Sequence, residues 1–290
     1  MNSLAYHRPR TVEEACDLLA RFGERARLLA GGTAVAILLK EGLLDVEHIV
    51  SLERVALDHV RWSDGVITLG AMATQQMLAE HPVIRERVPV LAEVLGQVAS
   101  RRIRTVATIG GNLCWAEAAS DPPGLLMALD ARVTAQSVRG RRHIAVRDLF
   151  QDYFTTSLAA DEVLTEVALP APPAGAGISY IKFTPQSKAD KPVLGVTALV
   201  RSRAGVCEHA AVVLGAAGPT PIALPEVDAQ LHGRLLDDAA AIAGVADAYA
   251  EAARPVSDTR GSEAYKRQMV RVLVRRALAQ AAGRAGGSHG

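Results

Sequence analysis

Two short glycine-containing segments carry the residue types that suit a charged ligand. The first is Ala30-Gly31-Gly32-Thr33-Ala34 and the second is Thr108-Ile109-Gly110-Gly111-Asn112. Glycine has no Cβ and adopts positive φ, so the backbone of such a turn can approach a ligand closely. Unpaired amide groups in the turn, or at the start of a following helix, suit phosphate oxygens. Two such turns, with polar side chains at Thr33, Thr108 and Asn112, predict a pyrophosphate held from two sides.

Neither turn is specific by itself, because Gly-Gly after a strand is also an ordinary tight turn. Neither matches G-x-G-x-x-G or G-x-x-x-x-G-K-[ST], which argues against a Rossmann dinucleotide site and against a nucleotide triphosphatase. Asp121 precedes a proline, so it either caps a helix or bonds ligand hydroxyls as ribose-binding acids do. The run Arg101-Arg102-Ile103-Arg104 is either solvated or neutralises a phosphate, and both interpretations stay open.

The elements around the first turn follow a β, glycine turn, helix order. Thr11 begins a capping box for an amphipathic helix that ends at Gly23. A strand over 27–30 leads into the turn, a short helix over 34–40 follows it, and the strand over 48–52 is then parallel to the first. This order places the turn at the end of a strand, where α/β folds commonly bind ligands.

The second turn lies in a more mixed region. We predict a short strand over 105–107 directly before it and a polar loop after Asn112. The remaining elements expected here are a hairpin over 60–69, helices over 74–80, 89–100 and 125–129, a hairpin over 132–146 and an edge strand over 163–169.

A linker rich in proline and glycine over 171–177 separates these elements from a C-terminal part. Alternating apolar runs there predict an antiparallel sheet with helices packed on it. The expected strands cover 178–184, 193–201 and 207–214, and the expected helices cover 237–253 and 262–282. The fold class is therefore α+β, with a small C-terminal domain built on a three-stranded antiparallel sheet.

Composition excludes several classes of protein. The chain has 290 residues, 49% hydrophobic and 22% charged, with a formal charge of +1, as in ordinary globular proteins. Scattered basic residues and 4% aromatic content argue against a nucleic-acid binder. The sequence contains no run of about 18 apolar residues, so no transmembrane span is predicted. No secretory signal is expected either. Cys16, Cys114 and Cys207 lie too far apart for an iron-sulfur or zinc site, and favour a cytoplasmic location.

The pattern 30–33 with 107–114, followed by Ala119-Ser120-Asp121-Pro122-Pro123, closely resembles the FAD-binding medium subunit of molybdenum hydroxylases, the xanthine dehydrogenase and carbon monoxide dehydrogenase family. Matches at Tyr6-His7-Arg8-Pro9 and Asp258-Thr259-Arg260 extend the resemblance to nearly the whole chain. It implies an FAD-binding domain of the PCMH type over 1–172, with two α/β subdomains of about 1–54 and 55–172. A C-terminal domain of the carbon monoxide dehydrogenase flavoprotein type over 178–284 and a flexible tail over 285–290 complete the expected organisation.

The resemblance also implies roles for individual residues. Residues Ala30 to Ala34 and Thr108 to Asn112 would bind the FAD pyrophosphate, and Asp121 would bond the sugar or ribityl region. Leu164 and Lys182 would lie near the isoalloxazine ring. Many relatives have a polar residue where this chain has Ala34, so a side-chain contact is lost there. No catalytic side chain and no metal ligand is expected.

The implied function is electron transfer through noncovalently bound FAD. A large partner subunit would carry the molybdenum cofactor and a small one the 2Fe-2S clusters, in a dimer of heterotrimers. The acceptor would be NAD, a quinone-linked carrier or oxygen. Two alternatives remain: a self-sufficient flavin oxidase of the vanillyl-alcohol-oxidase type, whose substrate domain is usually larger, and a non-enzymatic binding module, which leaves the polar loop after Asn112 unexplained.

Overall fold

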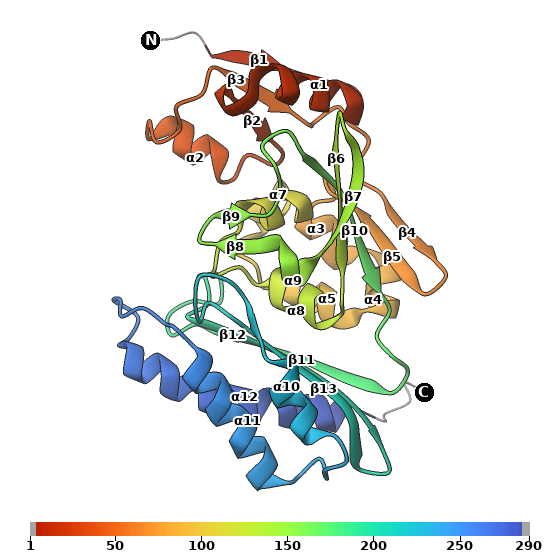
Figure 1. Cartoon of the computed structure of the whole chain (residues 1–290), viewed down its shortest axis with the longest axis vertical. Coiled ribbons are helices and arrows are strands. Elements are labelled where there is room, and N and C mark those ends of the chain that lie inside the picture. Colours follow the sequence, from red (N-terminus) through yellow and green to blue (C-terminus); the bar gives the residue numbers. More distant parts are fainter. Residues whose placement is uncertain (1–3, 286–290) are drawn as a thin grey trace.

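The computed structural model describes residues 4–285, with three main sheets stacked along the long axis of the molecule (Figure 1). The top sheet is parallel, in the order β1-β3-β2, from β1 (Ala5–His7), β2 (Ala26–Leu29) and β3 (His48–Ser51). The predicted parallel pair of β2 and β3 is confirmed, whereas β1 was not predicted. Residues 286–290 of the expected tail lie outside the described residues.

Helix α1 (Val12–Phe22) covers the first sheet and begins as predicted. The Thr11 hydroxyl accepts from the Glu14 amide at 3.1 Å, and Gly23 ends the helix with a φ of 56°. The short helix η1 (Gly23–Arg25) leads into β2. Helix α2 (Val35–Lys40) follows the first glycine turn and has no fully buried residue, which leaves it the least packed helix of this part.

The middle sheet is antiparallel, with strand order β4-β5-β10-β6-β7. Its strands are β4 (Val60–Ser63), β5 (Val66–Gly70), β6 (Arg132–Ser137), β7 (Gly140–Ala145) and β10 (Val163–Pro170). The prediction that residues 163–169 form an edge strand is wrong, because β10 lies between β5 and β6 at the centre. Two short strands, β8 (Phe150–Asp152) and β9 (Thr155–Thr156), form a separate hairpin.

The helices of the middle part lie between β5 and β6 in the sequence, apart from the single turn α9 (Val146–Leu149). They are α3 (Gln75–Glu80), α4 (Pro82–Arg87), α5 (Pro89–Gly96), α6 (Arg101–Arg104), α7 (Ile109–Trp115) and α8 (Pro122–Ala128). The strand predicted over 105–107 is wrong. The Ser100 hydroxyl caps α6 by accepting from the Ile103 amide, and the last turn of that helix continues into 105–107.

The C-terminal sheet has four antiparallel strands, not three, in the order β11-β12-β13-β14. They are β11 (Ala176–Phe183), β12 (Leu194–Arg203), β13 (Val206–Gly215) and β14 (Ile222–Ala223). The extra strand β14 has only two residues, too few to show an alternating pattern.

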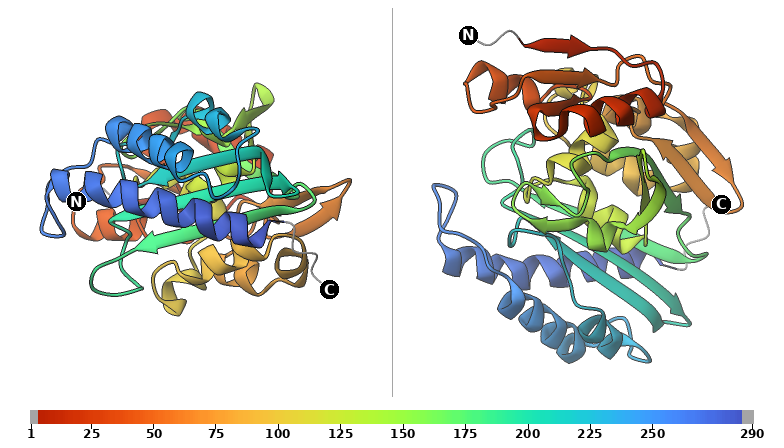
Figure 2. Two further views of the ribbon diagram at one scale, coloured as in Figure 1. Left: turned by 90° about the horizontal axis from the view of Figure 1, so that it is seen from below. Right: turned by 45° about the horizontal axis from the view of Figure 1, so that its top comes forward.

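Helices α11 (Ala239–Ala252) and α12 (Glu263–Arg284) cover the outer face of this sheet, as the views in Figure 2 show. The short α10 (Pro225–Asp228) and η2 (Ala229–Leu231) connect β14 to them. The inner face of the sheet packs on the middle part of the molecule. Ile178 of β11 and Leu199 of β12 belong to the same apolar core as β5, β6 and α8, so the linker over 171–177 joins two parts that share a core.

Candidate functional site

The first glycine turn presents free backbone amides. Within residues 4–285, the amides of Gly31, Gly32, Thr33 and Ala34 donate to no protein acceptor. Gly32 has a φ of 72°, in the region that favours glycine, and the turn leads directly into α2. Four amides without an acceptor in one bend are donors that a phosphate group could satisfy.

The second turn has the same glycine pair but a different state of its amides. The amides of Ile109 and Gly110 donate to the carbonyl groups of Ala73 and Ala71 at 3.0 and 2.9 Å. The Gly111 amide donates to the Thr108 hydroxyl at 3.0 Å, which is an N-cap bond for α7. Four of the five amides of this turn, those of residues 109–112, are therefore paired within the protein, because α7 starts here and is docked on the segment after β5.

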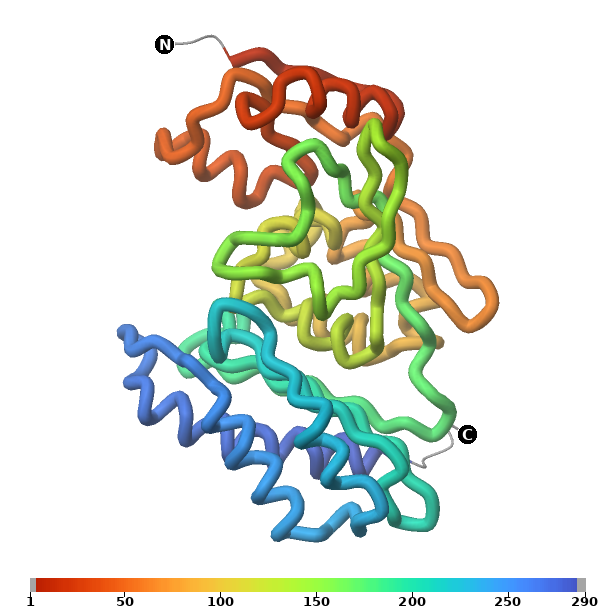
Figure 3. Tube along the Cα trace, viewed as in Figure 1, coloured from red at the N-terminus to blue at the C-terminus, as the bar shows by residue number. Residues whose placement is uncertain are grey.

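The two turns lie next to each other, and this close approach requires glycine at position 31. A Cβ on Gly31 would lie 1.8 Å from the Val106 carbonyl oxygen, and one on Gly111 would lie 3.5 Å from the Ala30 Cβ. Figure 3 shows the path of the chain that brings these segments, about 80 positions apart in the sequence, to one place between the top and middle parts. The structure thus brings together all ten turn residues that the sequence singled out.

Asp121 follows α7 in a segment that the C-terminal sheet holds in place. Ser120 donates to the Asn112 side chain at 2.8 Å, and the Ala216 amide, just after β13, donates to the Ala118 carbonyl at 2.9 Å. Asp121 stands at the N-cap of α8 but makes no capping bond through its side chain. The capping interpretation of its carboxylate is therefore wrong.

The Asp121 carboxylate is instead bound by two residues of β11. The Tyr180 hydroxyl donates to Oδ1 at 2.6 Å and the Lys182 ammonium donates to Oδ2 at 3.1 Å. The side chains of Asp121 and Lys182 are only 4% and 3% exposed. Burial raises the pKa of Asp121, while the Tyr180 hydrogen bond and the Lys182 charge oppose that rise. Burial also raises the pKa of Tyr180 well above its ordinary value, so Tyr180 is a donor at neutral pH.

A backbone loop after α5 joins the same network. Lys182 donates a second hydrogen bond to the Gln97 carbonyl at 2.8 Å. Arg104 holds the next two carbonyls, those of Val98 and Ala99, at 2.8 and 3.0 Å, and Ala99 has a φ of 42°. Arg104 is therefore a structural residue and not a free phosphate ligand.

Leu164 does not join these residues through its side chain. It is 3% exposed on β10 and packs in the main apolar core, next to a bulge between Leu164 and Glu166. The sequence also missed Tyr180, although its spacing of two from Lys182 on a strand places both side chains on one face. The Gln97 carbonyl left no signal in the sequence, because any residue type supplies one.

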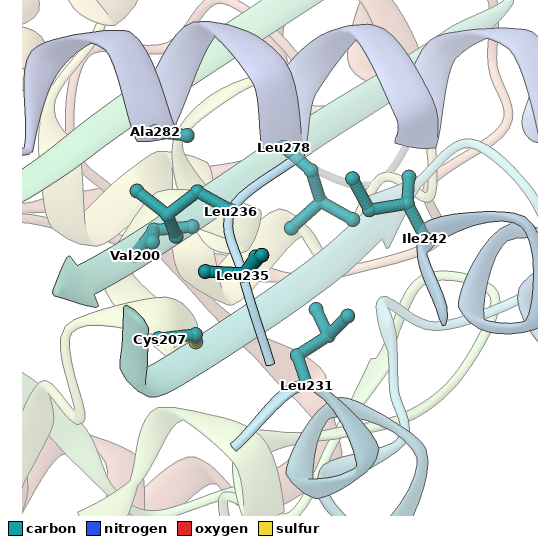
Figure 4. A pocket seen from close by; sticks show the side chains of 8 residues that line it. All are labelled: Val200, Cys207, Leu231, Leu235, Leu236, Ile242, Leu278 and Ala282. Carbon is teal, nitrogen blue, oxygen red and sulfur yellow. The ribbon is translucent and has the colours of Figure 1, made fainter. Parts of the chain in front are cut away.

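An apolar pocket in the C-terminal part is not the ligand site. Cys207, Leu231 and Leu278 are among the eight residues that line it in Figure 4. Its volume is about 20 Å³, close to the space of one water molecule. No group of three or more His, Cys, Asp and Glu side chains that could hold a metal ion occurs within residues 4–285. No helix in that range is long and apolar enough to cross a bilayer.

Comparison with known proteins places this chain, including both glycine turns, in a known family. Residues 2–172 match the model of the FAD binding domain in molybdopterin dehydrogenase, and residues 179–281 match the CO dehydrogenase flavoprotein C-terminal domain. The chain belongs to this family. It is an FAD-carrying subunit of the molybdenum hydroxylase class, which confirms the predicted family, cofactor and oxidoreductase role.

Relatives of this flavoprotein subunit match it end to end. The carbon monoxide dehydrogenase medium chain of Afipia carboxidovorans is 33% identical, covering 98% of each chain. The 6-hydroxypseudooxynicotine dehydrogenase complex subunit alpha of Paenarthrobacter nicotinovorans is 34% identical, covering 95% of this chain and 93% of the relative. A structure of carbon monoxide dehydrogenase from Hydrogenophaga pseudoflava superposes with a TM-score of 0.94 at 30% identity, covering 98% of this chain and 99% of that one.

Proposed function

We propose that this subunit holds the FAD pyrophosphate between its two glycine turns and passes electrons from partner iron-sulfur clusters to an external acceptor. The four free amides of residues 31–34 carry the proposal, because they are donors that a phosphate would satisfy. Thr108 to Asn112 supply the opposite wall, and Asp121 accepts from hydroxyl groups of the sugar or ribityl chain. Bound FAD supplies the redox chemistry, and the protein supplies position and electrostatics.

The flavin ring lies on the Lys182 side of the site in this proposal. Lys182 is fixed by Asp121 and by the Gln97 carbonyl, so its charge is held at one place. In this proposal Leu164 lies near the flavin ring through its backbone position on β10, since its side chain is buried in the core. The proposed units are the FAD-binding domain over 1–172, with subdomains of about 1–54 and 55–172, and the C-terminal domain over 178–284.

We infer the partner subunits from the complexes in which relatives occur. Two relatives are named as a medium chain and as a subunit of a dehydrogenase complex. In our proposal a large subunit with the molybdenum cofactor and a small subunit with 2Fe-2S clusters assemble with this chain as a dimer of heterotrimers. NAD, a quinone-linked carrier or oxygen accepts the electrons, and the sparse cysteines favour the cytoplasm.

Flavin binding by the purified full chain tests this proposal. We expect the purified chain to show the absorption bands of flavin and to release this flavin on denaturation. We also expect negligible turnover of alcohols by the chain alone. A chain that stays colourless after reconstitution with FAD would refute the proposal. Turnover of an alcohol by the chain alone would instead support an independent oxidase.

A further inference from the structure

We propose that Tyr180 is a positioning residue for the Asp121 carboxylate, fixing it as an acceptor for the hydroxyl groups of the cofactor's sugar chain. This inference rests on the proposed function, because it assumes that Asp121 faces FAD. It assigns a role to a C-terminal residue that the sequence did not single out. Tyr180 touches Asp121 and acts through it.

The geometry gives each oxygen of Asp121 its own donor. Tyr180 and Lys182 are two positions apart on β11, so both side chains point to the same face of the strand. The Tyr180 hydroxyl reaches Oδ1 at 2.6 Å and the Lys182 ammonium reaches Oδ2 at 3.1 Å. Two donors at two oxygens fix both the position and the rotation of the carboxylate plane.

The remaining hydrogen-bonding capacity of Asp121 suits a polyhydroxylated ligand. An ionised carboxylate offers about four acceptor sites, and the two donors of β11 use two of them. The Tyr180 hydroxyl has a single proton, and it uses this proton in the hydrogen bond that it donates to Asp121. The carboxylate is therefore left as an acceptor, and hydroxyl groups of a ribityl or ribose chain are matching donors.

The charge on Asp121 depends on the same two neighbours. Burial disfavours the ionised form, while the Tyr180 hydrogen bond and the Lys182 charge favour it. Lys182 is the charged group that acts on Asp121, and Gln97, which faces Lys182 from the loop after α5, is neutral. Loss of the Tyr180 hydroxyl therefore shifts Asp121 toward its protonated form, which accepts hydrogen bonds less well.

Gly195 leaves the room that the Tyr180 hydroxyl needs. It pairs with Lys182 across β11 and β12, and a Cβ on Gly195 would lie 3.0 Å from the phenol oxygen. Any larger residue at this position would push the hydroxyl away from its present place. Gly195→Ala therefore perturbs the same hydrogen bond without changing Tyr180.

The test measures the dissociation constant of FAD for the full chain between pH 6 and pH 8. Tyr180→Phe should weaken FAD binding by roughly 10-fold at pH 6, the lower end of what a hydrogen bond to a charged group contributes. The loss should be smaller at pH 8 than at pH 6, because a higher pH favours the ionised form of Asp121. The original chain should change less over the same range than the variant, because the Tyr180 hydrogen bond favours the ionised form of Asp121. Tyr265→Phe, at an exposed tyrosine of α12, is the matched control and should behave like the original chain.

A double-mutant cycle separates positioning from a purely structural role. In an Asp121→Ala background, Tyr180→Phe should change FAD binding by less than about 2-fold, since no side-chain acceptor is left for the Tyr180 hydroxyl. Gly195→Ala should reproduce a smaller version of the Tyr180→Phe pH profile.

Three outcomes overturn the inference. Tyr180→Phe that binds FAD like the original chain at every pH, or that weakens binding equally with and without Asp121, refutes it while the proposed function stands. Failure of the original chain to bind FAD at any pH refutes both together.

Discussion

The two glycine turns have similar composition but differ in the hydrogen bonding of their backbone amides. Residues 31–34 are half-buried, carry four amides without a protein acceptor and lead into a helix with no fully buried residue. Residues 109–112 donate all four of their amides within the protein, and Ile109 and Gly110 are fully buried. We therefore propose that the first turn binds the ligand through its backbone amides, and that the second turn forms the opposite wall of the site and supports the first.

This contrast shows why a glycine pair alone does not reveal a phosphate site. In the second turn glycine serves close packing, because a Cβ on Gly110 would lie 2.6 Å from the Ala71 Cβ. In the first turn glycine serves both packing and access, with Gly31 against Val106 and Gly32 at positive φ. Substitutions at the two turns should therefore separate loss of cofactor from loss of stability.

The largest effect on the cofactor is expected for Gly31→Ala. Its Cβ would overlap the Val106 carbonyl oxygen, so the first turn must move away from the second. FAD binding should weaken by roughly 100-fold, or about 2.7 kcal/mol, as measured by titration of the full chain. Gly96→Ala, in open space at the end of α5, is the control and should bind normally. Normal binding by Gly31→Ala would mean that the two turns do not grip the ligand together.

Gly110→Ala should chiefly lower stability. The added methyl meets both the side chain and the backbone of Ala71, and overpacking of this kind costs about 1–3 kcal/mol. Denaturant unfolding of the cofactor-free chain should show the full loss. Added FAD should stabilise the variant and the original chain equally, so that the difference between them remains. Gly244→Ala, in open space on α11, should leave stability equal or improved. If Gly110→Ala unfolds normally but loses FAD, the roles that we assign to the turns must be exchanged.

Thr108→Ala sharpens the comparison at a single hydrogen bond. It removes the cap of α7 and leaves the Gly111 amide unpaired, which should cost about 1 kcal/mol of stability. FAD binding should change by less than about 3-fold, well below 1 kcal/mol, because we assign this turn a role in packing. Thr11→Ala removes a similar cap from α1 and should show the same loss in thermal unfolding. A much larger loss of FAD binding in Thr108→Ala would show that its hydroxyl contacts the ligand.

The smallest effect is expected for Ala34→Ser. Ala34 is the N-cap of α2 and makes no capping bond with its side chain. A serine hydroxyl there should add less than about 0.5 kcal/mol, the lower limit for side-chain caps, because the Ala34 backbone is helical (φ −104°, ψ −53°) and not extended as in such caps. The melting temperature should therefore change little, as for Ala36→Ser at an exposed position inside the same helix. A clear rise for Ala34→Ser alone would show that the start of α2 can use a side-chain cap.

Local chemistry in the sequence predicted the elements that depend on neighbours in the chain. The Thr11 cap of α1, the hairpin of β6 and β7, and the long helix α12 after Ser262 all formed as expected. The order of strands is a property of the whole sheet, so the central place of β10 could not be read from its own residues. The strand predicted over 105–107 failed because Ser100 starts a helix just before it.

The candidate site was predictable in its side chains and not in its backbone. Motif similarity brought forward Asp121 and Lys182, which the structure places 3.1 Å apart. Whether an amide is free or paired depends on which distant carbonyl meets it, and Ala71 and Ala73 gave no warning of that role. Tyr180 was within reach, since a strand period of two pairs it with Lys182.

The shared core around Ile178 and Leu199 has a consequence for how the protein would come apart. The linker is exposed at residues 173–175, so a protease can reach its backbone there. The strand that follows, β11, is nevertheless packed against the middle part of the molecule on one face and against α12 on the other. A cut there would yield two fragments that still travel together through a sizing column. Separating the fragments would require denaturant, and the same step would release the bound FAD.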